Sequence, residues 1–160
     1  MQLPSSTEWV LHAATTLAQL EPGESASAAR LAVYYDLPAP YLAKQLQALV
    51  RAGLLTATTG PRGGFRLARR PAEVTLLELV EAVDGASSPY ECREIRQQGA
   101  GALPAAECRD TCVLAAKMAD AHSAWRQSLE RTTLADVLTE IPATAPARTR
   151  AKLAAIRTGP

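Results

Sequence analysis

The sequence has little of what several classes of protein require. Its 160 residues include three cysteines and only 4% aromatic residues. They contain no uncharged apolar run of the ~18 residues that a membrane-spanning helix needs, and the first residues lack the basic and then apolar pattern of a secretion signal. Neither a nucleophile–base motif nor a phosphate-binding loop is present. We therefore expect a cytoplasmic protein that is not an enzyme and has no membrane partner.

The remaining composition favours a mainly helical protein with reactive or ligating thiols. Hydrophobic residues make up 48% of the sequence, and alanine is common among them. The cysteines are Cys92, Cys108 and Cys112. In a reducing compartment thiols stay reduced, so an odd set of three favours ligand or redox roles over a structural disulfide.

Charge is distributed unevenly along the chain, although the net charge is only +1. Residues 1–29 include three acidic residues and no basic ones. Residues 30–70 include seven basic residues against one acidic residue, a net charge of +6. Such a segment is expected of a surface that contacts phosphates. The alternative is a solvated basic face without a partner.

Hydrophobic periodicity in the first half predicts three helices, over residues 5–20, 27–35 and 41–53. The stretch LLTATTGPRGGFRLARR, residues 54–70, predicts two short strands joined by a basic tip. Helix, turn, helix and a basic hairpin make a winged helix-turn-helix. The expected fold class is therefore mainly α, with a small β-hairpin wing.

The second half predicts a helix over residues 75–85, a loop over 86–103 and a long helix from 104 to about 131. A short helix follows at 132–140, and the basic residues from 142 onward are expected to be disordered. The long helix has an apolar stripe that little of the chain is left to cover, so we expect a homodimer. The stripe consists of Leu114, Met118, Ala121, Trp125 and Leu129.

Four motifs, in this order, resemble a known family of bacterial-type regulators. They are LPAPYLAKQLQALVRAGLL (37–55), GPRGGFRLAR (60–69), VTLLELVEAVDG (74–85) and TTLADVL (132–138). The family is that of the dimeric winged-helix regulators that include the iron–sulfur-cluster regulator IscR and the nitric-oxide-sensing repressor NsrR. The resemblance covers about residues 1–140. It implies a repressor that dimerises through the long helix and binds an inverted-repeat operator in double-stranded DNA.

The resemblance places the DNA contacts on the third helix and on the wing. Tyr41, Lys44 and Gln45 are available on the recognition helix, and Arg62 is at the wing tip. Ala43 stands where some relatives have an acid that contacts a base. The DNA-binding role therefore carries over, whereas the operator sequence of the relatives does not.

The ligand pattern of the family is broken in this chain. Family members with clusters have three closely spaced cysteines before the long helix. Here Cys112 is at the third of these positions, Cys108 is displaced from the second, and Cys92 is separated from them by a stretched loop. Ala115 stands where one relative has a histidine ligand. The usual set of ligands is therefore incomplete.

Two residue pairs would complete a different site. Cys108 and Cys112 are four residues apart on the expected long helix, and Glu8 and His12 are four apart on the first helix, so each pair suits one metal atom. In the family the first helix packs beside the partner's cluster, and the nitric-oxide sensor takes an acidic ligand from this position. We expect a [2Fe–2S] cluster shared between subunits, with two ligands per iron. Trp9, between two of the ligands, is a candidate for redox coupling.

Several alternatives stay open at this point. The same four ligands suit zinc, Cys108 and Cys112 suit a thiol–disulfide switch, and Cys92 suits a [4Fe–4S] nitric-oxide sensor as third thiolate. Glu8 suits a helix cap for Ser5, and the winged helix suits a protein-interaction module. On the leading interpretation the chain divides into a DNA-binding domain, a cluster-proximal loop, cluster-binding and dimerisation helices, and a disordered basic tail. Their bounds are 1–85, 86–104, 105–141 and 142–160.

Overall fold

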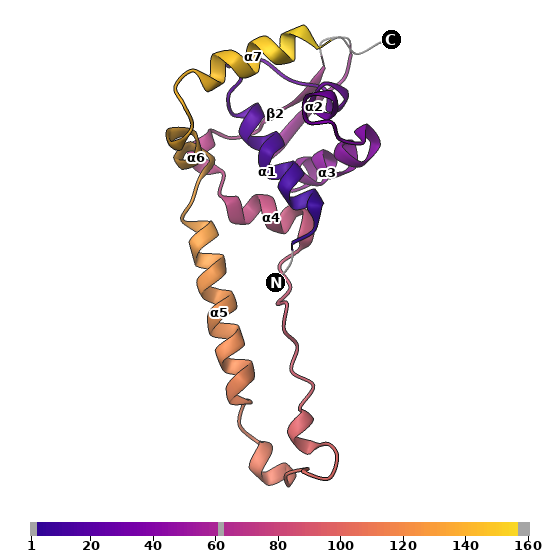
Figure 1. The fold of residues 1–160 in the computed structure, drawn as a ribbon, viewed down its shortest axis with the longest axis vertical. Helices are drawn as coiled ribbons and strands as arrows, with labels where there is room; N and C mark the ends of the chain where they lie inside the picture. The colour runs from indigo at the N-terminus through magenta and orange to yellow at the C-terminus, as the bar shows by residue number, and fades with distance from the viewer. Residues whose placement is uncertain (1–2, 61–62, 157–160) are drawn as a thin grey trace. The chain divides into compact units, whose positions relative to one another are not determined.

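The computed structural model describes residues 3–60 and 63–156, which divide into two units (Figure 1). Residues 86–128 form one unit, which we call the cysteine unit. The other described residues, on both sides of it in the sequence, form the winged-helix unit. Each unit is described by itself.

The winged-helix unit begins with three helices and a hairpin. Helix α1 (Ser5–Leu17) is followed by α2 (Ala28–Tyr35) and α3 (Ala39–Arg51). Strands β1 (Leu55–Thr58) and β2 (Gly64–Leu67) then pair in antiparallel register. This is the arrangement of a winged helix-turn-helix, as the sequence predicts.

Local sequence signals set the ends of α2 and α3. The Ser27 hydroxyl accepts a hydrogen bond from the Arg30 amide at 3.2 Å and so caps the start of α2. Asp36 ends α2 in the left-handed region, at φ 54°, and Pro38 precedes α3. Gly53, at φ 72°, follows the end of α3 as expected. The turn between the two helices is therefore fixed by capping residues.

The core of the unit forms where α3 packs against α1 and α4 (Leu76–Asp84). Leu42, Leu46 and Leu49 on α3 are fully buried, which confirms the predicted stripe. Burying one leucine side chain contributes about 1.5–3 kcal/mol. The other fully buried side chains of largest volume are Val10, Leu31, Leu54, Leu55, Val74, Leu79, Val80, Leu134 and Leu153.

The wing approaches the start of α2 so closely that only glycine fits at position 64. Phe65 and Ala26 exchange backbone hydrogen bonds of 2.9 and 3.1 Å. A Cβ atom on Gly64 would lie 2.6–2.9 Å from backbone atoms of Ala26 and Ser27. Gly64 therefore fixes the wing against the first helix of the helix-turn-helix.

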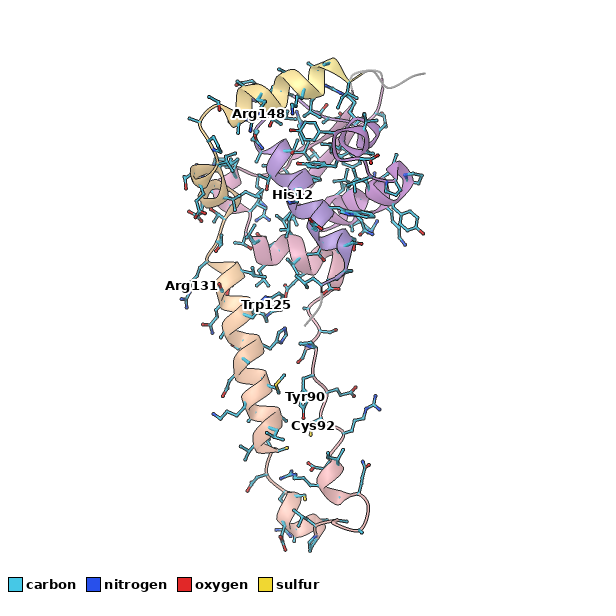
Figure 2. All side chains as sticks on the ribbon, in the orientation of Figure 1. His12, Tyr90, Cys92, Trp125, Arg131 and Arg148 are labelled. Atoms are coloured by element: carbon cyan, nitrogen blue, oxygen red, sulfur yellow. The ribbon has the colours of Figure 1, made fainter. Side chains whose placement is uncertain are left out.

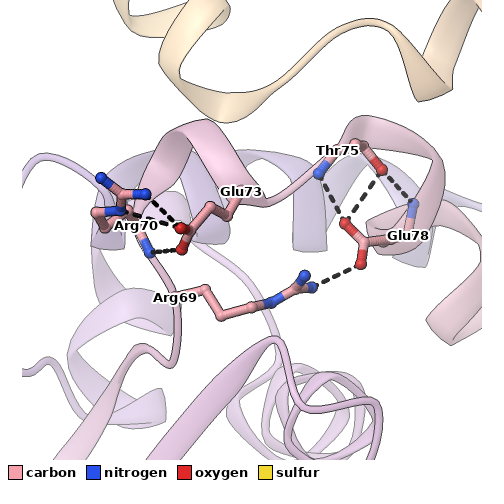
Figure 3. A network of polar contacts seen from close by, with 5 residues as sticks. All are labelled: Arg69, Arg70, Glu73, Thr75 and Glu78. Atoms are coloured by element: carbon pink, nitrogen blue, oxygen red, sulfur yellow. Dashed lines mark hydrogen bonds and ion pairs between the residues drawn. The ribbon is translucent and has the colours of Figure 1, made fainter.

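Two acidic side chains brace the connection from the wing to α4 (Figure 3). Glu78 accepts from the Thr75 amide at 2.9 Å while the Thr75 hydroxyl accepts from the Glu78 amide at 3.2 Å, the predicted capping box. The same carboxylate pairs with Arg69 at 2.6 Å. Glu73 pairs with Arg70 at 2.5 Å in the preceding turn η1 (Pro71–Glu73).

Helix α6 (Leu134–Glu140) brings the chain back to the winged-helix unit. Its first turn is joined to the segment before α4, because the Leu134 amide donates to the Val74 carbonyl at 2.9 Å. The Thr133 hydroxyl caps α6 by accepting from the Asp136 amide. The Thr133 and Asp136 pairing is a second capping box.

Helix α7 (Ala145–Ala155) corrects the expectation of a disordered tail from residue 142. It lies beside α2 (Figure 1) and buries Thr149 and Leu153. The Thr149 hydroxyl donates to the side chain of Gln19 at 2.9 Å, and the guanidinium of Arg30 donates to the Leu153 carbonyl. The basic composition of this segment suggested disorder, but its residues four apart bury an apolar face. Charge composition alone was therefore a poor guide here.

The cysteine unit corrects the expectation of a helix that starts at residue 104. A turn of 3₁₀-helix, η3 (Ala105–Cys108), ends four residues before Cys112, and α5 (Val113–Glu130) begins only after it. The residues between, including Asp110 and Thr111, favour hydrogen bonds to nearby backbone over helix. A second short turn, η2 (Ile95–Gln97), lies earlier in the unit.

Helix α5 has no buried residue within the described chain. Val113, Leu114 and Met118 are 69%, 68% and 42% exposed, so much of the predicted apolar stripe lacks a cover within the described chain. Among the helices of the described residues, none combines the length and apolarity needed to cross a membrane.

Candidate functional site

The outer face of α3 presents the residues expected to contact DNA. Tyr41 is 64% exposed, Lys44 is exposed, and Gln45 is half-buried, opposite the buried leucine stripe of the same helix. On a helix, residues three and four apart share a side, so these three side chains form one surface. Arg62, predicted at the wing tip, lies outside the described residues.

Glu8 and His12 lie one turn apart on the exposed side of α1, as their spacing predicts. Trp9 is half-buried and packs against the core. A hollow of about 290 Å³ is lined by these three residues together with Tyr35 and Leu37. The two predicted ligands therefore share one surface hollow with the end of α2.

The cap proposed for Ser5 is not formed. Pro4 occupies the position before α1, and no side chain caps that end of the helix. The alternative role of Glu8 as a cap for Ser5 is therefore wrong. A carboxylate in the first turn still suits the positive end of the helix dipole.

Tyr35 connects the surface of α1 to the helix-turn-helix, a contact that the sequence did not reveal. Its ring lies 5.8 Å from the His12 ring, centre to centre. Its hydroxyl donates to the His12 carbonyl at 3.2 Å and shares a 2.5 Å hydrogen bond with the Thr16 hydroxyl. Burial raises the pKa of Tyr35, so this phenol stays protonated in the folded chain.

In the cysteine unit, Cys112 directly precedes α5, and its carbonyl accepts from the Ala116 amide at 2.9 Å. Hydrogen bonds from the Ala115 and Leu114 amides lower the pKa of the Cys112 thiol, and Arg96 and the Cys92 thiol add to this effect. A helix start favours a thiolate at this position. Cys112 is therefore prepared to act as a ligand or a nucleophile.

Arg96 organises the segments that hold the three thiols. It pairs with Glu94 at 2.5 Å and donates to the Asp110 carbonyl at 3.0 Å. The hydrogen bonds that Arg96 donates to the Glu94 carboxylate raise the pKa of Arg96, and the charges of Cys108 and Cys112 act in the same direction. The sequence alone indicates no role for Arg96, because a lone arginine in a loop belongs to no recognisable motif.

The relation between the cysteines differs from the expected one in two ways. Cys108 ends η3 whereas Cys112 precedes α5, so the two are not one turn apart on a common helix. Cys92, placed by the sequence in a stretched loop and labelled in Figure 2, is exposed, and it lines one hollow together with Cys112. The long separation of Cys92 in sequence concealed this proximity.

Within the described residues of one chain, no group of three or more histidine, cysteine and acidic side chains is arranged to hold a metal ion. The pair Glu8 and His12 belongs to the winged-helix unit, and Cys108 and Cys112 belong to the cysteine unit. The assembly of the four residues around one cluster stays a prediction.

Comparison with known proteins places the chain among regulators of transcription. A model of the Rrf2 family, described as an iron-dependent transcriptional regulator, matches residues 3–140. The regulator NsrR of Geobacillus kaustophilus is 28% identical over 138 residues, which are 86% of this chain and 90% of that protein. IscR of Cereibacter sphaeroides is 40% identical over 68 residues, covering 42% of this chain and 44% of that protein.

The structure of CymR, the global cysteine regulator of B. subtilis, has the same fold. It superposes with a TM-score of 0.67 at 22% identity, and the match covers 89% of this chain and 99% of that chain. The predicted fold is thereby confirmed. The expected partners are DNA and a second copy of the chain, and these relatives are likewise dimeric DNA-binding regulators. The relatives are regulators of transcription and not enzymes.

Proposed function

The chain belongs to the Rrf2 family of transcriptional regulators, and we propose that it is a dimeric repressor whose DNA binding is controlled by an iron–sulfur cluster. The exposed polar face of α3 would enter the major groove of an inverted-repeat operator. The positively charged segment 30–70 would contact phosphates. The observation that carries the DNA-binding part is the surface formed by Tyr41, Lys44 and Gln45 beside the wing.

The donor groups present suit a [2Fe–2S] cluster shared between two chains. Glu8 and His12 would hold one iron, and Cys108 and Cys112 of the other chain would hold the second. The exposed carboxylate and imidazole and the half-buried thiols are types of ligand that iron accepts. When bound, such a cluster supplies reversible one-electron chemistry.

The residues around His12 offer a route from this site to DNA. Tyr35 contacts the His12 ring and holds the His12 and Thr16 positions of α1 through its hydroxyl. It is also the last residue of α2, so a shift of His12 would be passed to the helix-turn-helix. Trp9, which lines the same hollow, is the second candidate for this coupling.

Anaerobic purification of the full-length protein tests the cluster. We expect a brown-red protein with equal amounts of iron and acid-labile sulfide. Cys108→Ala and Cys112→Ala should be colourless, and Glu8→Ala and His12→Ala should change the absorption spectrum without dissociating the dimer. Colourless wild-type protein that contains zinc instead would replace this proposal with a zinc site.

One observation favours a second candidate, a [4Fe–4S] cluster that includes Cys92. The Cys92 thiol helps to lower the pKa of Cys112 and lines the same hollow, so its sulfur is near a proposed ligand. Cys92→Ala distinguishes the two. A nearly unchanged spectrum supports the [2Fe–2S] site, whereas loss of colour, together with wild-type spectra for the Glu8 and His12 variants, supports the thiolate-rich one.

DNA binding is tested by Lys44→Ala and Arg62→Ala in a gel-retardation titration at several salt concentrations. Each lost phosphate contact reduces the slope of log K against log salt by about one unit per site. Gln47→Ala, an exposed change on the same helix, serves as the comparison. Unchanged affinity and slope in both basic variants would remove these residues from the interface.

A further inference from the structure

Cys92 and Cys112 line the same hollow, although the proposed [2Fe–2S] site uses Cys112 without Cys92. The Cys92 thiol lies near enough to Cys112 to help lower the pKa of the Cys112 thiol. Both line one hollow of about 490 Å³, formed by residues 90–96 and 112–114, and the lining leaves out Cys108. This is an arrangement of two thiols beside a space that admits a small molecule.

The two segments that carry these thiols are tied together by Arg96. Its guanidinium donates to the Asp110 carbonyl at 3.0 Å, and its own carbonyl accepts from the Leu103 amide at 2.8 Å. The pairing with Glu94 holds the guanidinium in place from the other side. The two segments that bring Cys92 and Cys112 to one hollow are therefore held by interactions other than those of the thiols.

We propose that Cys92 and Cys112 form an intrachain redox pair, which closes to a disulfide when a hydroperoxide enters this hollow in protein without a cluster. Cys112 is the sulfur that attacks the peroxide first, because it lies at the start of α5 beside the amides of Leu114 and Ala115. Cys92 is the resolving thiol, because it is exposed and lines the same hollow.

The chemistry balances with hydrogen peroxide as the only co-reactant. The Cys112 sulfur attacks one peroxide oxygen, the O–O bond breaks, and the departing hydroxide takes the thiol proton to give water and a sulfenic acid. The Cys92 sulfur then attacks Cys112, the S–S bond forms and the S–O bond breaks. The second hydroxide leaves with the Cys92 proton as water. Two electrons pass from the two sulfurs to the peroxide.

The disulfide has a consequence for regulation, which rests on the proposed cluster function. It removes Cys112 from the ligand set, so an oxidised chain is unable to load a cluster until a thiol reductant reopens the bond. Peroxide would thereby hold the regulator in its cluster-free state.

Peptide mapping tests the pair directly, since trypsin separates the three cysteines. Cleavage after Arg93 and Arg109 puts Cys92, Cys108 and Cys112 on different peptides. Full-length protein is reduced, freed of iron by a chelator, treated with hydrogen peroxide, blocked with N-ethylmaleimide and digested. We expect the Cys92–Cys112 linkage to exceed any linkage of Cys108 by at least ~tenfold, because exchange depends on which sulfurs have access.

Two variants keep the test decisive. Cys108→Ser is the matched control and should form the same disulfide as wild type. Cys92→Ser should stop at a sulfenic acid on Cys112, trapped by dimedone. On a non-reducing gel the oxidised chain should run as a monomer.

A dominant Cys108–Cys112 link, a dimer-sized band or overoxidation without any disulfide would each overturn the pair. These assays detect disulfide bonds in iron-free protein, so their results do not depend on whether the cluster proposal is correct. If the anaerobically purified protein were colourless, the cluster proposal would be refuted, whereas the proposal of a Cys92–Cys112 disulfide would be unaffected.

Discussion

The two units of this chain are held together in different ways. In the winged-helix unit, leucines of α3 are fully buried and helix starts are closed by capping boxes at Thr75 and Thr133. In the cysteine unit, α5 buries nothing within the described chain, and the segments before it depend on the hydrogen bonds of Arg96. The first unit is stabilised by its own core, whereas the second needs polar contacts and a partner.

Because of this difference, the DNA-binding fold and the thiols proposed to control it are in units of different stability. A unit with its own core keeps one structure, so the face of α3 that we propose contacts DNA keeps a constant shape. A unit with little buried apolar surface has a low cost of local rearrangement. The three thiols are in that second unit, where little packing has to be disrupted when a sulfur changes its bonds.

The largest expected effect is in the core of the first unit. Leu46→Ala removes a fully buried side chain and should lower the free energy of unfolding by about 3 kcal/mol, since the cavity collapses only in part. Urea denaturation followed by circular dichroism measures it. Val33→Ala, which is 61% exposed, is the control and should change the value by less than about 0.5 kcal/mol. Equal effects would refute a core centred on α3.

The next effect is on the exposed stripe of α5. Met118→Glu should raise the dimer dissociation constant about 100-fold, or about 2.7 kcal/mol, because a carboxylate would be buried unpaired in the interface. Analytical ultracentrifugation on dilution measures this, with circular dichroism as a check on folding. Ala119→Glu adds the same charge on another side of α5 and should have little effect. If both variants stay dimeric, the stripe is not the interface.

Prediction from the sequence succeeded where the structure depends on the pattern of neighbouring residues. The spacing of Leu42, Leu46 and Leu49 was enough to predict the buried stripe of α3. The capping-box spacing of Thr75 and Glu78 was enough to predict the start of α4. Neither prediction needed information about residues far away in the chain. The wing was predicted for the same reason, since its strands are adjacent in sequence.

Prediction from the sequence failed where the structure depends on a few polar contacts between residues that are far apart in the chain. Nothing local indicates that Arg96 donates to the Asp110 carbonyl, or that Cys92 lines the same hollow as Cys112, twenty positions later. The helix that was expected to carry both Cys108 and Cys112 does not form, because Asp110 and Thr111, which have weak helix preference, lie between them. Helix α7 was missed because its partner surface on α2 and Gln19 lies far back in the sequence.

The packing of α7 gives a smaller prediction. Thr149→Val keeps the shape of a buried side chain but leaves the Gln19 amide oxygen without its donor. The loss should be about 1–2 kcal/mol of unfolding free energy, the usual cost of an unpaired buried polar group. Urea denaturation measures it, and hydrogen exchange should show faster exchange in α7. Arg148→Ala, exposed on the same helix (Figure 2), should behave as wild type; if it is equally destabilised, the effect is not due to the hydrogen bond.

The smallest effect concerns Glu78, and its sign depends on pH. Burial opposes ionisation, but hydrogen bonds from Thr75 and Arg69 outweigh it and lower the pKa of Glu78. Ionised Glu78 therefore stabilises the folded state at pH values above the unfolded pKa of about 4.3, and this contribution is lost as the pH falls through the lower folded pKa. Glu78→Gln should cost less than about 1 kcal/mol at pH 7, since the side chain is 39% exposed.

The cost of Glu78→Gln should disappear in acid, where wild type is protonated as well. Urea denaturation at pH 7 and below the folded pKa measures both ends. Arg69→Gln, alone and combined with Glu78→Gln, completes a double-mutant cycle, whose coupling isolates the ion pair drawn in Figure 3 from the cap. A coupling of zero at pH 7 would assign the whole effect to the Thr75 capping box. A cost for Glu78→Gln that persists in acid would show that the carboxylate acts through packing and not through its charge.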